Sequence, residues 1–240
     1  MNARPHRYYR VLFSICLLVM ASLALPGRWN RLASPGYLVL ALSMIVGLGR
    51  PLSGESLGRP ARHLYRGLGI LTIAVGVLWS LTPVEHRDSG IPLILLWSLF
   101  SVWSSLRLVR SLAGERRVSP PVITGAFAGY LMLGLTSGLL CSTLETIHPG
   151  SFIDLQHSGS PLMPHNGPVG LGQPVWMLNF VRLNYFAFVS LTTMGYGDVL
   201  PATPQAQMLG VLIATMGTFY VAVVMGLLIS RIIANEAGRH

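Results

Sequence analysis

The chain has 240 residues, of which 52% are hydrophobic and only 10% are charged, and its formal net charge is +9. This composition is too apolar for a soluble domain of that size and indicates a membrane protein. The positive charge comes from arginines in short segments between apolar stretches. That distribution is typical of membrane orientation and argues against nucleic acid as a partner.

Six apolar stretches predict six transmembrane helices in chain order. They cover residues 11–25, 36–49, 67–81, 91–109, 122–147 and 205–234. The first two are short against the roughly 20 residues that a helix needs to cross the hydrocarbon core. Flanking aromatic and arginine side chains extend them to the membrane interface.

The arginines favour one orientation of these helices. With the N-terminus inside, thirteen arginines lie on the inner side and four on the outer side, as the positive-inside rule predicts. The inner arginines are Arg4, Arg7, Arg10, Arg50, Arg59, Arg62, Arg66, Arg107, Arg110, Arg116, Arg117, Arg231 and Arg239, and the outer ones are Arg28, Arg31, Arg87 and Arg182. We therefore expect a multi-pass protein of the cell membrane with both termini in the cytoplasm.

A glycine-rich motif lies between the fifth and sixth stretches. It reads Thr192-Thr193-Met194-Gly195-Tyr196-Gly197-Asp198 and follows an apolar, aromatic segment at about 177–192. That segment is too short to cross the membrane and return, so it predicts a re-entrant helix buried in protein. The two glycines allow a backbone of alternating handedness at low steric cost, which points successive carbonyls toward one axis. Such carbonyls can replace the water around a bare K⁺ ion.

Two side chains of the motif have expected roles of their own. Thr193 adds a hydroxyl oxygen at the inner end of the carbonyl row. Tyr196 directs its ring away from the axis, where surrounding aromatics can brace it. A phosphate-binding loop is the competing interpretation, but such a loop usually brings a lysine, and this chain has none.

The motif resembles the T-V-G-Y-G filter signature of the potassium-channel family. Met194 stands where valine or isoleucine is commonest, and Asp198 follows as the family expects. The resemblance covers about residues 121–234, and the local sequence around Glu145 is similar to bacterial members. It implies an all-α membrane protein with six transmembrane helices, a re-entrant pore helix and a selectivity filter. Thr193, Met194, Gly195, Tyr196 and Gly197 would then form the filter, with K⁺ at the first four.

Further expectations follow from this resemblance. The chain carries one filter motif, and a filter is a ring of carbonyls from four copies, so the channel would be a homotetramer. Its partners would be K⁺ ions, the lipid bilayer and three further copies of itself. It would need no cofactor and would not be an enzyme, since no Ser-His, Cys-His or paired-carboxylate constellation is evident.

The chain divides into two predicted parts. Residues 1–118 form a four-helix membrane domain with a layout like a voltage sensor, and residues 119–240 form a pore domain of outer helix, pore helix, filter and inner helix. Voltage sensors carry arginines at every third position through the membrane. Here only Arg107 and Arg110 fit, at the inner end, and residues 91–106 are uncharged. We expect both to be membrane anchors, without strong voltage gating.

Three residues are candidates for supporting the filter: Thr192, Asp198 and Glu145. In related channels, a glutamate at the position of Glu145 braces the backbone just after the filter; the alternative is an interfacial acid in contact with water. We expect Asp198 at the outer mouth. Related channels often pair it with a carboxylate or a tryptophan on the pore helix, but Val189 occupies the position of the carboxylate here.

The sixth stretch contains a candidate gating hinge. Gly217 lies twenty residues after Gly197, where potassium channels place the hinge of the inner helix. The alternative is a glycine that permits close packing, and Gly226 is a second hinge candidate. The residues expected to line the cavity, by resemblance and spacing, are Thr218, Val221 and Met225.

Two alternative functions remain open from the sequence. A cation channel of poor K⁺/Na⁺ selectivity is one, because Met194 departs from the commonest residue. A transporter or structural membrane protein, in which the loop is incidental, is the other. Two G-x-x-x-G patterns, Gly125 to Gly129 and Gly134 to Gly138, also predict close contacts along the fifth helix.

Overall fold

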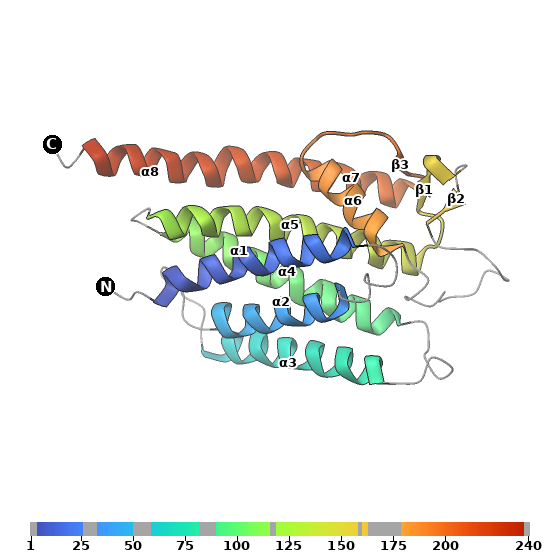
Figure 1. The fold of residues 1–240 in the computed structure, drawn as a ribbon, viewed down its shortest axis with the longest axis horizontal. Helices are drawn as coiled ribbons and strands as arrows, with labels where there is room; N and C mark the ends of the chain where they lie inside the picture. The colour runs from blue at the N-terminus through green and yellow to red at the C-terminus, as the bar shows by residue number, and fades with distance from the viewer. Residues whose placement is uncertain are drawn as a thin grey trace. The chain divides into compact units, whose positions relative to one another are not determined.

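The computed structural model describes residues 4–25, 33–49, 59–81, 90–115, 119–157, 160–162 and 179–237. Within these ranges the chain is helical apart from turns and one small sheet (Figure 1). The helices are α1 Arg4–Leu23, α2 Ala33–Leu48, α3 Arg59–Leu81, α4 Ile91–Gly114, α5 Pro120–Ile147, α6 Phe180–Leu191, α7 Pro204–Phe219, the π-helix η5 Tyr220–Met225 and α8 Gly226–Ala237, with a 3₁₀ turn η3 at Leu155–His157. The strands are β1 Phe152–Asp154, β2 Ser160–Pro161 and β3 Val199–Pro201.

Several expectations lie outside the described residues. These are Arg28, Arg31, Arg50, Arg87, Arg116, Arg117 and Arg239 of the predicted loops, and the start of the predicted pore helix at Met177. The described part of the chain divides into two compact units. Unit 1 comprises residues 1–73, 100–133 and 219–240, and unit 2 comprises residues 74–99 and 134–218. This division cuts through α3, α4 and α5, so the boundary near residue 118 stays a prediction.

Three described helices are long and apolar enough to cross a membrane. They are Ile91–Gly114, Pro120–Ile147 and the continuous helix Pro204–Ile233. Two shorter apolar helices lie at Gly36–Leu48 and Phe180–Leu191. The third predicted span falls within α3, and the first lies in α1 except for its last two residues; these helices have 23 and 20 residues, or about 30–35 Å at 1.5 Å per residue. The chain is thus a helical membrane protein, and six spans stay a prediction.

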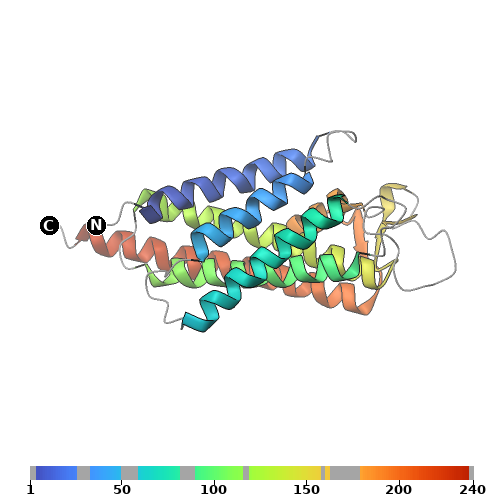
Figure 2. The ribbon, with the colours of Figure 1, turned by 90° about the horizontal axis from the view of Figure 1, so that it is seen from below.

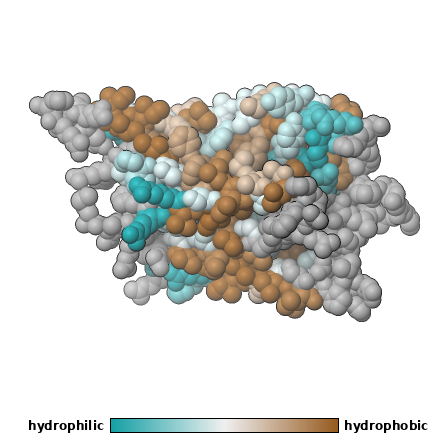
Figure 3. All heavy atoms as spheres, in the orientation of Figure 1, coloured by the Kyte–Doolittle hydropathy of each residue, from teal (hydrophilic) through white to brown (hydrophobic). Residues whose placement is uncertain are grey.

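The surface of the molecule is rich in apolar side chains. Figure 3 shows hydrophobic residues in brown over much of the face that it presents. Leu18, Leu64 and Leu78 are 68%, 63% and 67% exposed. Isolated exposed leucines are ordinary in any protein, but helices with this many indicate an apolar surrounding such as lipid.

Unit 1 is packed around the buried pair Tyr65 and Arg107. The guanidinium of Arg107 lies 4.5 Å from the centre of the Tyr65 ring, and the Tyr65 hydroxyl lies 2.8 Å from the Ser104 hydroxyl. Arg107 is 1% exposed, whereas Arg110 is exposed. Arg107 is therefore not the membrane anchor at the surface that we expected. Its guanidinium is buried inside the unit, where it contacts the face of the Tyr65 ring.

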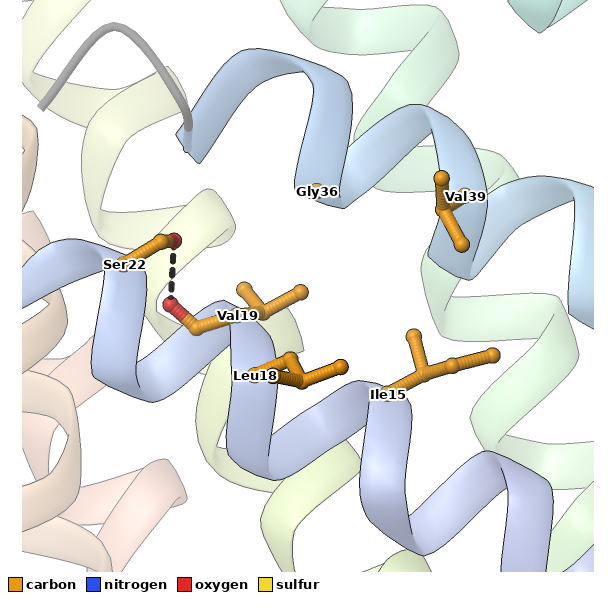
Figure 4. Close-up of a pocket in the computed structure, with 6 residues that line it drawn as sticks. All are labelled: Ile15, Leu18, Val19, Ser22, Gly36 and Val39. Atoms are coloured by element: carbon orange, nitrogen blue, oxygen red, sulfur yellow. Dashed lines mark hydrogen bonds between the residues drawn. The ribbon is translucent and has the colours of Figure 1, made fainter. Parts of the chain in front are cut away.

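Helices α1 and α2 pack side by side in unit 1, as Figures 1 and 2 agree. A hollow between them is drawn in Figure 4 and is lined by Ile15, Leu18, Val19, Ser22, Gly36 and Val39. Its one polar side chain, Ser22, donates a hydrogen bond to the carbonyl of Val19 at 2.6 Å. The hollow is thus an apolar gap beside a glycine, with its hydroxyl already bonded within α1.

A small antiparallel sheet joins two loops of unit 2, with strand order β2-β1-β3. Phe152 pairs with Pro201 and Asp154 with Val199 across β1 and β3. The sequence predicted an all-α protein; the described chain is mostly helical, and this small sheet is the part that the prediction missed. Strands of two or three residues carry no detectable periodicity, and the partners of β1 in β3 lie far away along the chain.

The predicted close contacts along α5 are confirmed. A Cβ added at any of the four glycines of the two G-x-x-x-G patterns would come within 3.0 Å of a neighbouring side chain. The neighbours are Tyr9 for Gly125, Tyr220 for Gly129, Phe188 for Gly134 and Asn184 for Gly138. The glycines therefore make room for large side chains.

The substitution Gly134→Ala tests this packing. The added methyl group would meet the ring of Phe188, so we expect the free energy of unfolding to fall by about 1–3 kcal/mol. Gly67→Ala on α3 is the matched control, because nothing lies within 4 Å of its added Cβ; it should be neutral or stabilising by up to about 1 kcal/mol. Thermal unfolding in detergent compares the two, and equal melting temperatures would contradict the packing argument.

Candidate ion-coordination site

Helix α6 brings the chain to the glycine-rich motif. The side chain of Asn179 caps it by accepting a hydrogen bond from the backbone N–H of Arg182 at 3.2 Å. At the other end, the N–H and the hydroxyl of Thr192 both donate to the carbonyl of Phe188, at 2.9 and 2.8 Å. Twelve residues make a helix of about 18 Å, which is too short for the hydrocarbon core of about 30 Å.

The backbone after α6 alternates in handedness. Thr193, Gly195 and Gly197 have φ angles of 59°, 57° and 75°, whereas Met194 and Tyr196 between them do not have positive φ. The alternation expected at the two glycines is therefore observed. Thr193 extends it by one residue, which the sequence did not signal because β-branched residues rarely adopt positive φ. Alternation of this kind turns successive carbonyls toward the same side.

The motif is anchored at its start and open along its length. The N–H groups of Thr193 and Met194 donate to the carbonyls of Ser190 and Val189, at 3.0 and 2.9 Å. The hydroxyl of Thr193 donates to the carbonyl of Thr192 at 2.7 Å. Residues 193–197 are all exposed in the single chain. The segment 193–197 is therefore open to its surroundings in the single chain.

The Tyr196 ring stacks on an aromatic residue of α6, as expected for a bracing role. Its centre lies 6.5 Å from that of Tyr185, and the planes differ by 7°. Behind them, Phe186 packs against Phe152 of β1 with ring centres 5.0 Å apart. Aromatic pairs at such distances stabilise by about 0.5–1.5 kcal/mol beyond the area that they bury.

Glu145 near the end of α5 is fully buried, so it is not the water-exposed acid of the alternative interpretation. Its carboxylate accepts hydrogen bonds from the N–H groups of Gly150 and Phe152, at 2.9 and 3.0 Å. These bonds shape the turn before β1, and not the backbone just after the motif as the resemblance implied. Because β1 pairs with β3, any support that Glu145 gives the motif passes through the sheet.

Asp198 has a partner that the sequence did not predict. Its carboxylate Oδ2 lies 3.4 Å from Nη1 of Arg182 in the first turn of α6 and 3.4 Å from Nε2 of Gln156. Val189, which stands where related channels carry a carboxylate, is buried. The sequence placed Arg182 among the outer arginines without a role, because the pairing depends on how α6 is turned.

Gly217 lies against the end of α6. A Cβ there would collide with the backbone carbonyl of Leu191, the last residue of α6. This contact favours the close-packing alternative, and the hinge stays a prediction. Among the cavity candidates, Thr218 and Val221 are exposed and Met225 is half-buried. The π-helix η5, which begins at Tyr220, had no signal in the sequence; π-helices in longer helices frequently mark functional sites.

No group of three or more histidine, cysteine, aspartate or glutamate side chains gathers as a possible metal site among the residues that the structure describes. His148 and His157 belong to the loop after α5, and His165 lies outside the described ranges.

One comparison with known proteins bears on this site. Residues 160–234 match a family model described as an ion channel. The matched segment contains α6, the motif, β3, α7 and the π-helix. No curated protein matches the chain. The match supports an ion channel family and a channel function for this membrane protein.

The substitution Gly217→Ala tests whether this glycine is required for packing. Its methyl group would displace the carbonyl of Leu191, so we expect a loss of about 1–3 kcal/mol in the free energy of unfolding. Gly226→Ala is the matched control in the same helical stretch, because nothing lies within 4 Å of its added Cβ. Thermal unfolding measures both. A Gly217→Ala protein as stable as the control would contradict the packing role and leave the gating hinge as the remaining interpretation of Gly217.

The substitution Glu145→Gln tests the buried carboxylate. An amide NH₂ cannot accept a hydrogen bond, so one of the N–H groups of Gly150 and Phe152 would lose its acceptor. We expect a loss of about 1–3 kcal/mol, measured by thermal unfolding. Amide hydrogen exchange should be faster at Gly150 or Phe152 and unchanged at Ala126 in α5; unchanged exchange at both Gly150 and Phe152 would contradict this role.

Proposed function

We propose that this protein is a K⁺-selective channel, which conducts passively through a pore formed by four copies and resembles bacterial potassium channels with six-span subunits. The observation that carries the proposal is the alternating backbone at Thr193, Gly195 and Gly197 in an exposed segment. Carbonyl rows of this kind replace the hydration shell of K⁺. Thr193, Met194, Gly195 and Tyr196 would supply the oxygen ligands.

The exposure of the motif supports assembly into a tetramer. Irregular backbone at membrane depth is tolerated only where protein buries it or where it lines a water-filled cavity. One chain offers a single row of carbonyls, which leaves most of the coordination shell of an ion empty. Four rows around one axis complete that shell, and their assembly buries the rest of the exposed segment.

The inner helix supports the same arrangement. Only 28% of the most apolar stretch of Pro204–Ile233 is buried, against 72% for Pro120–Ile147. Met208 and Phe219 are each 64% exposed. In the proposed tetramer, neighbouring copies and lipid cover these side chains, while Thr218, Val221 and Met225 face the cavity and Gly217 serves as the hinge.

The remaining features of the proposal follow from membrane orientation. Six spans place both termini in the cytoplasm and the filter at the outer side of the cell membrane. The protein catalyses no reaction and needs no cofactor, and voltage has little influence on it because the outer part of α4 is uncharged. A weakly selective cation channel is the second candidate, favoured by the exposed methionine at position 194, where the family signature has valine or isoleucine.

The reversal potential tests the proposal. With K⁺ on one side of a planar bilayer and Na⁺ on the other, we expect the purified protein to give a current that reverses close to the K⁺ equilibrium limit. Reversal near zero would contradict K⁺ selectivity and favour the weakly selective cation channel. A monomer in detergent without current would favour a transporter or structural protein.

The substitution Gly195→Ala links that current to the motif. Nothing lies within 4 Å of the added Cβ, so the change tests only the left-handed backbone, which costs a residue with a side chain about 1–2 kcal/mol. We expect reversal to move toward zero or the current to disappear, while Gly67→Ala on α3, whose added Cβ also has nothing within 4 Å, behaves as the wild type. Unchanged selectivity in Gly195→Ala would mean that this backbone does not coordinate the ion.

A further inference from the structure

Arg182 makes more charged contacts than any other described side chain near the motif. Its Nε and Nη2 donate to the two carboxylate oxygens of Asp154, at 2.9 and 2.6 Å. Its Nη1 lies 3.4 Å from Oδ2 of Asp198. Its guanidinium also lies 5.2 Å from the centre of the Tyr185 ring. One side chain thus contacts two carboxylates and one aromatic face.

These contacts connect three separate parts of unit 2. Asp154 ends β1, Asp198 ends the glycine-rich motif, and Tyr185 lies on α6 and stacks on Tyr196 of the motif. Arg182 therefore contacts the motif directly, through Asp198, and indirectly, through the stacked pair of rings. Two-point contact of this kind restrains both the position and the rotation of the segment between Tyr196 and Asp198.

The helix dipole and burial both disfavour a cation at position 182, and the carboxylates of Asp154 and Asp198 stabilise it there. A cation in the first turn of a helix faces the positive end of the helix dipole, and α6 has no acidic residue in that turn. Burial also acts to lower the pKa of Arg182. The hydrogen bond and charge of Asp154, followed by the charge of Asp198, outweigh burial and raise that pKa above its ordinary value.

The side chains of both ion pairs are largely shielded from water, so their attraction is screened less than that of surface pairs. The side chains of Arg182, Asp154 and Asp198 are 18%, 3% and 16% exposed. The Asp154 pair is bidentate, which fixes the plane of the guanidinium and so the direction of Nη1. Asp154 thereby orients the arginine, and the arginine in turn holds Asp198.

The backbone around Asp198 depends on a few further bonds. Its carbonyl accepts from the N–H of Leu155 at 2.9 Å, and its Oδ1 accepts from the N–H of Val199 at 3.1 Å. Gln156 adds a neutral contact to Oδ2 at 3.4 Å. Arg182 is the cation that the described residues place at this carboxylate, so its removal leaves a partly buried negative charge with neutral donors alone.

We propose that Arg182 is a positioning residue, which holds Asp198 and, through Tyr185, Tyr196, and so keeps the outer half of the carbonyl row in its ion-coordinating conformation. This inference rests on the proposed channel function. Without the arginine, Asp198 and the Tyr196 ring each lose a restraint, and the carbonyls between them leave the shared axis more often. The channel then conducts less often, although the fold is intact.

Arg182→Gln is the first test. The fraction of time that single channels conduct should fall about tenfold, which corresponds to about 1.4 kcal/mol. Arg182→Lys keeps the charge without the planar fork and should give a smaller loss. Size-exclusion chromatography must find the same assembly as in the wild type; a conducting fraction equal to the wild type in both variants overturns the inference.

Two further variants separate positioning from mere stability. Asp198→Asn leaves the Arg182–Asp154 pair intact, and it should lower the conducting fraction about as much as Arg182→Gln. The double variant should add little to either loss in conducting fraction, because both changes break the same contact between Arg182 and Asp198. Losses that simply add would mean that the two residues act separately, and would overturn the inference.

The charge swap Asp154→Arg with Arg182→Asp adds a readout that stability alone does not predict. It restores an ion pair between β1 and α6, but it places a second carboxylate beside Asp198. We expect the melting temperature to recover toward the wild type while conduction stays low. Recovery of both would assign Arg182 a structural role only.

The wild-type reversal potential separates this inference from the proposed function. A wild type that does not distinguish K⁺ from Na⁺ overturns the proposed function, and the positioning role with it. A selective wild type with unchanged conduction in the Arg182 variants overturns the positioning role alone.

Discussion

The site depends on five residues of backbone, 193–197, that form neither helix nor strand. Their backbone alternates in handedness and all five residues are exposed in the single chain, but this conformation denies them the regular hydrogen bonds of secondary structure. A segment of this kind has no conformational preference strong enough to hold it alone. Its geometry must come from the elements on either side.

Those elements fix the segment at both ends by different means. At the start, the C-terminal turn of α6 accepts the N–H groups of Thr193 and Met194. At its C-terminal end, β3 pairs with β1 in the sheet, and Arg182 forms an ion pair with the carboxylate of Asp198. Between the two ends, the stacked ring of Tyr196 restrains the middle. The buried carboxylate of Glu145 on α5 holds the turn that precedes β1. Because β1 pairs with β3, this carboxylate also supports the C-terminal end of the motif.

The glycines in the helices around the site have a common physical use. Gly134 and Gly138 on α5 admit the side chains of Phe188 and Asn184 on α6, and Gly217 on α7 admits the carbonyl that ends α6. A short helix enclosed in this way is held by contact on several sides. This enclosure gives α6 a defined position from which Arg182 and Tyr185 reach the motif.

The sequence by itself determined the apolar helices, the motif and its two left-handed glycines, because hydrophobic periodicity and glycine content are local properties. It also identified Glu145, Gly217 and the α5 glycines as special. Only the tertiary structure decided what those residues contact, since β1 and β3 pair across 45 or more positions and the Arg182–Asp154–Asp198 cluster joins three distant segments. Such pairings depend on how elements pack and rotate, and no single stretch of sequence carries that information.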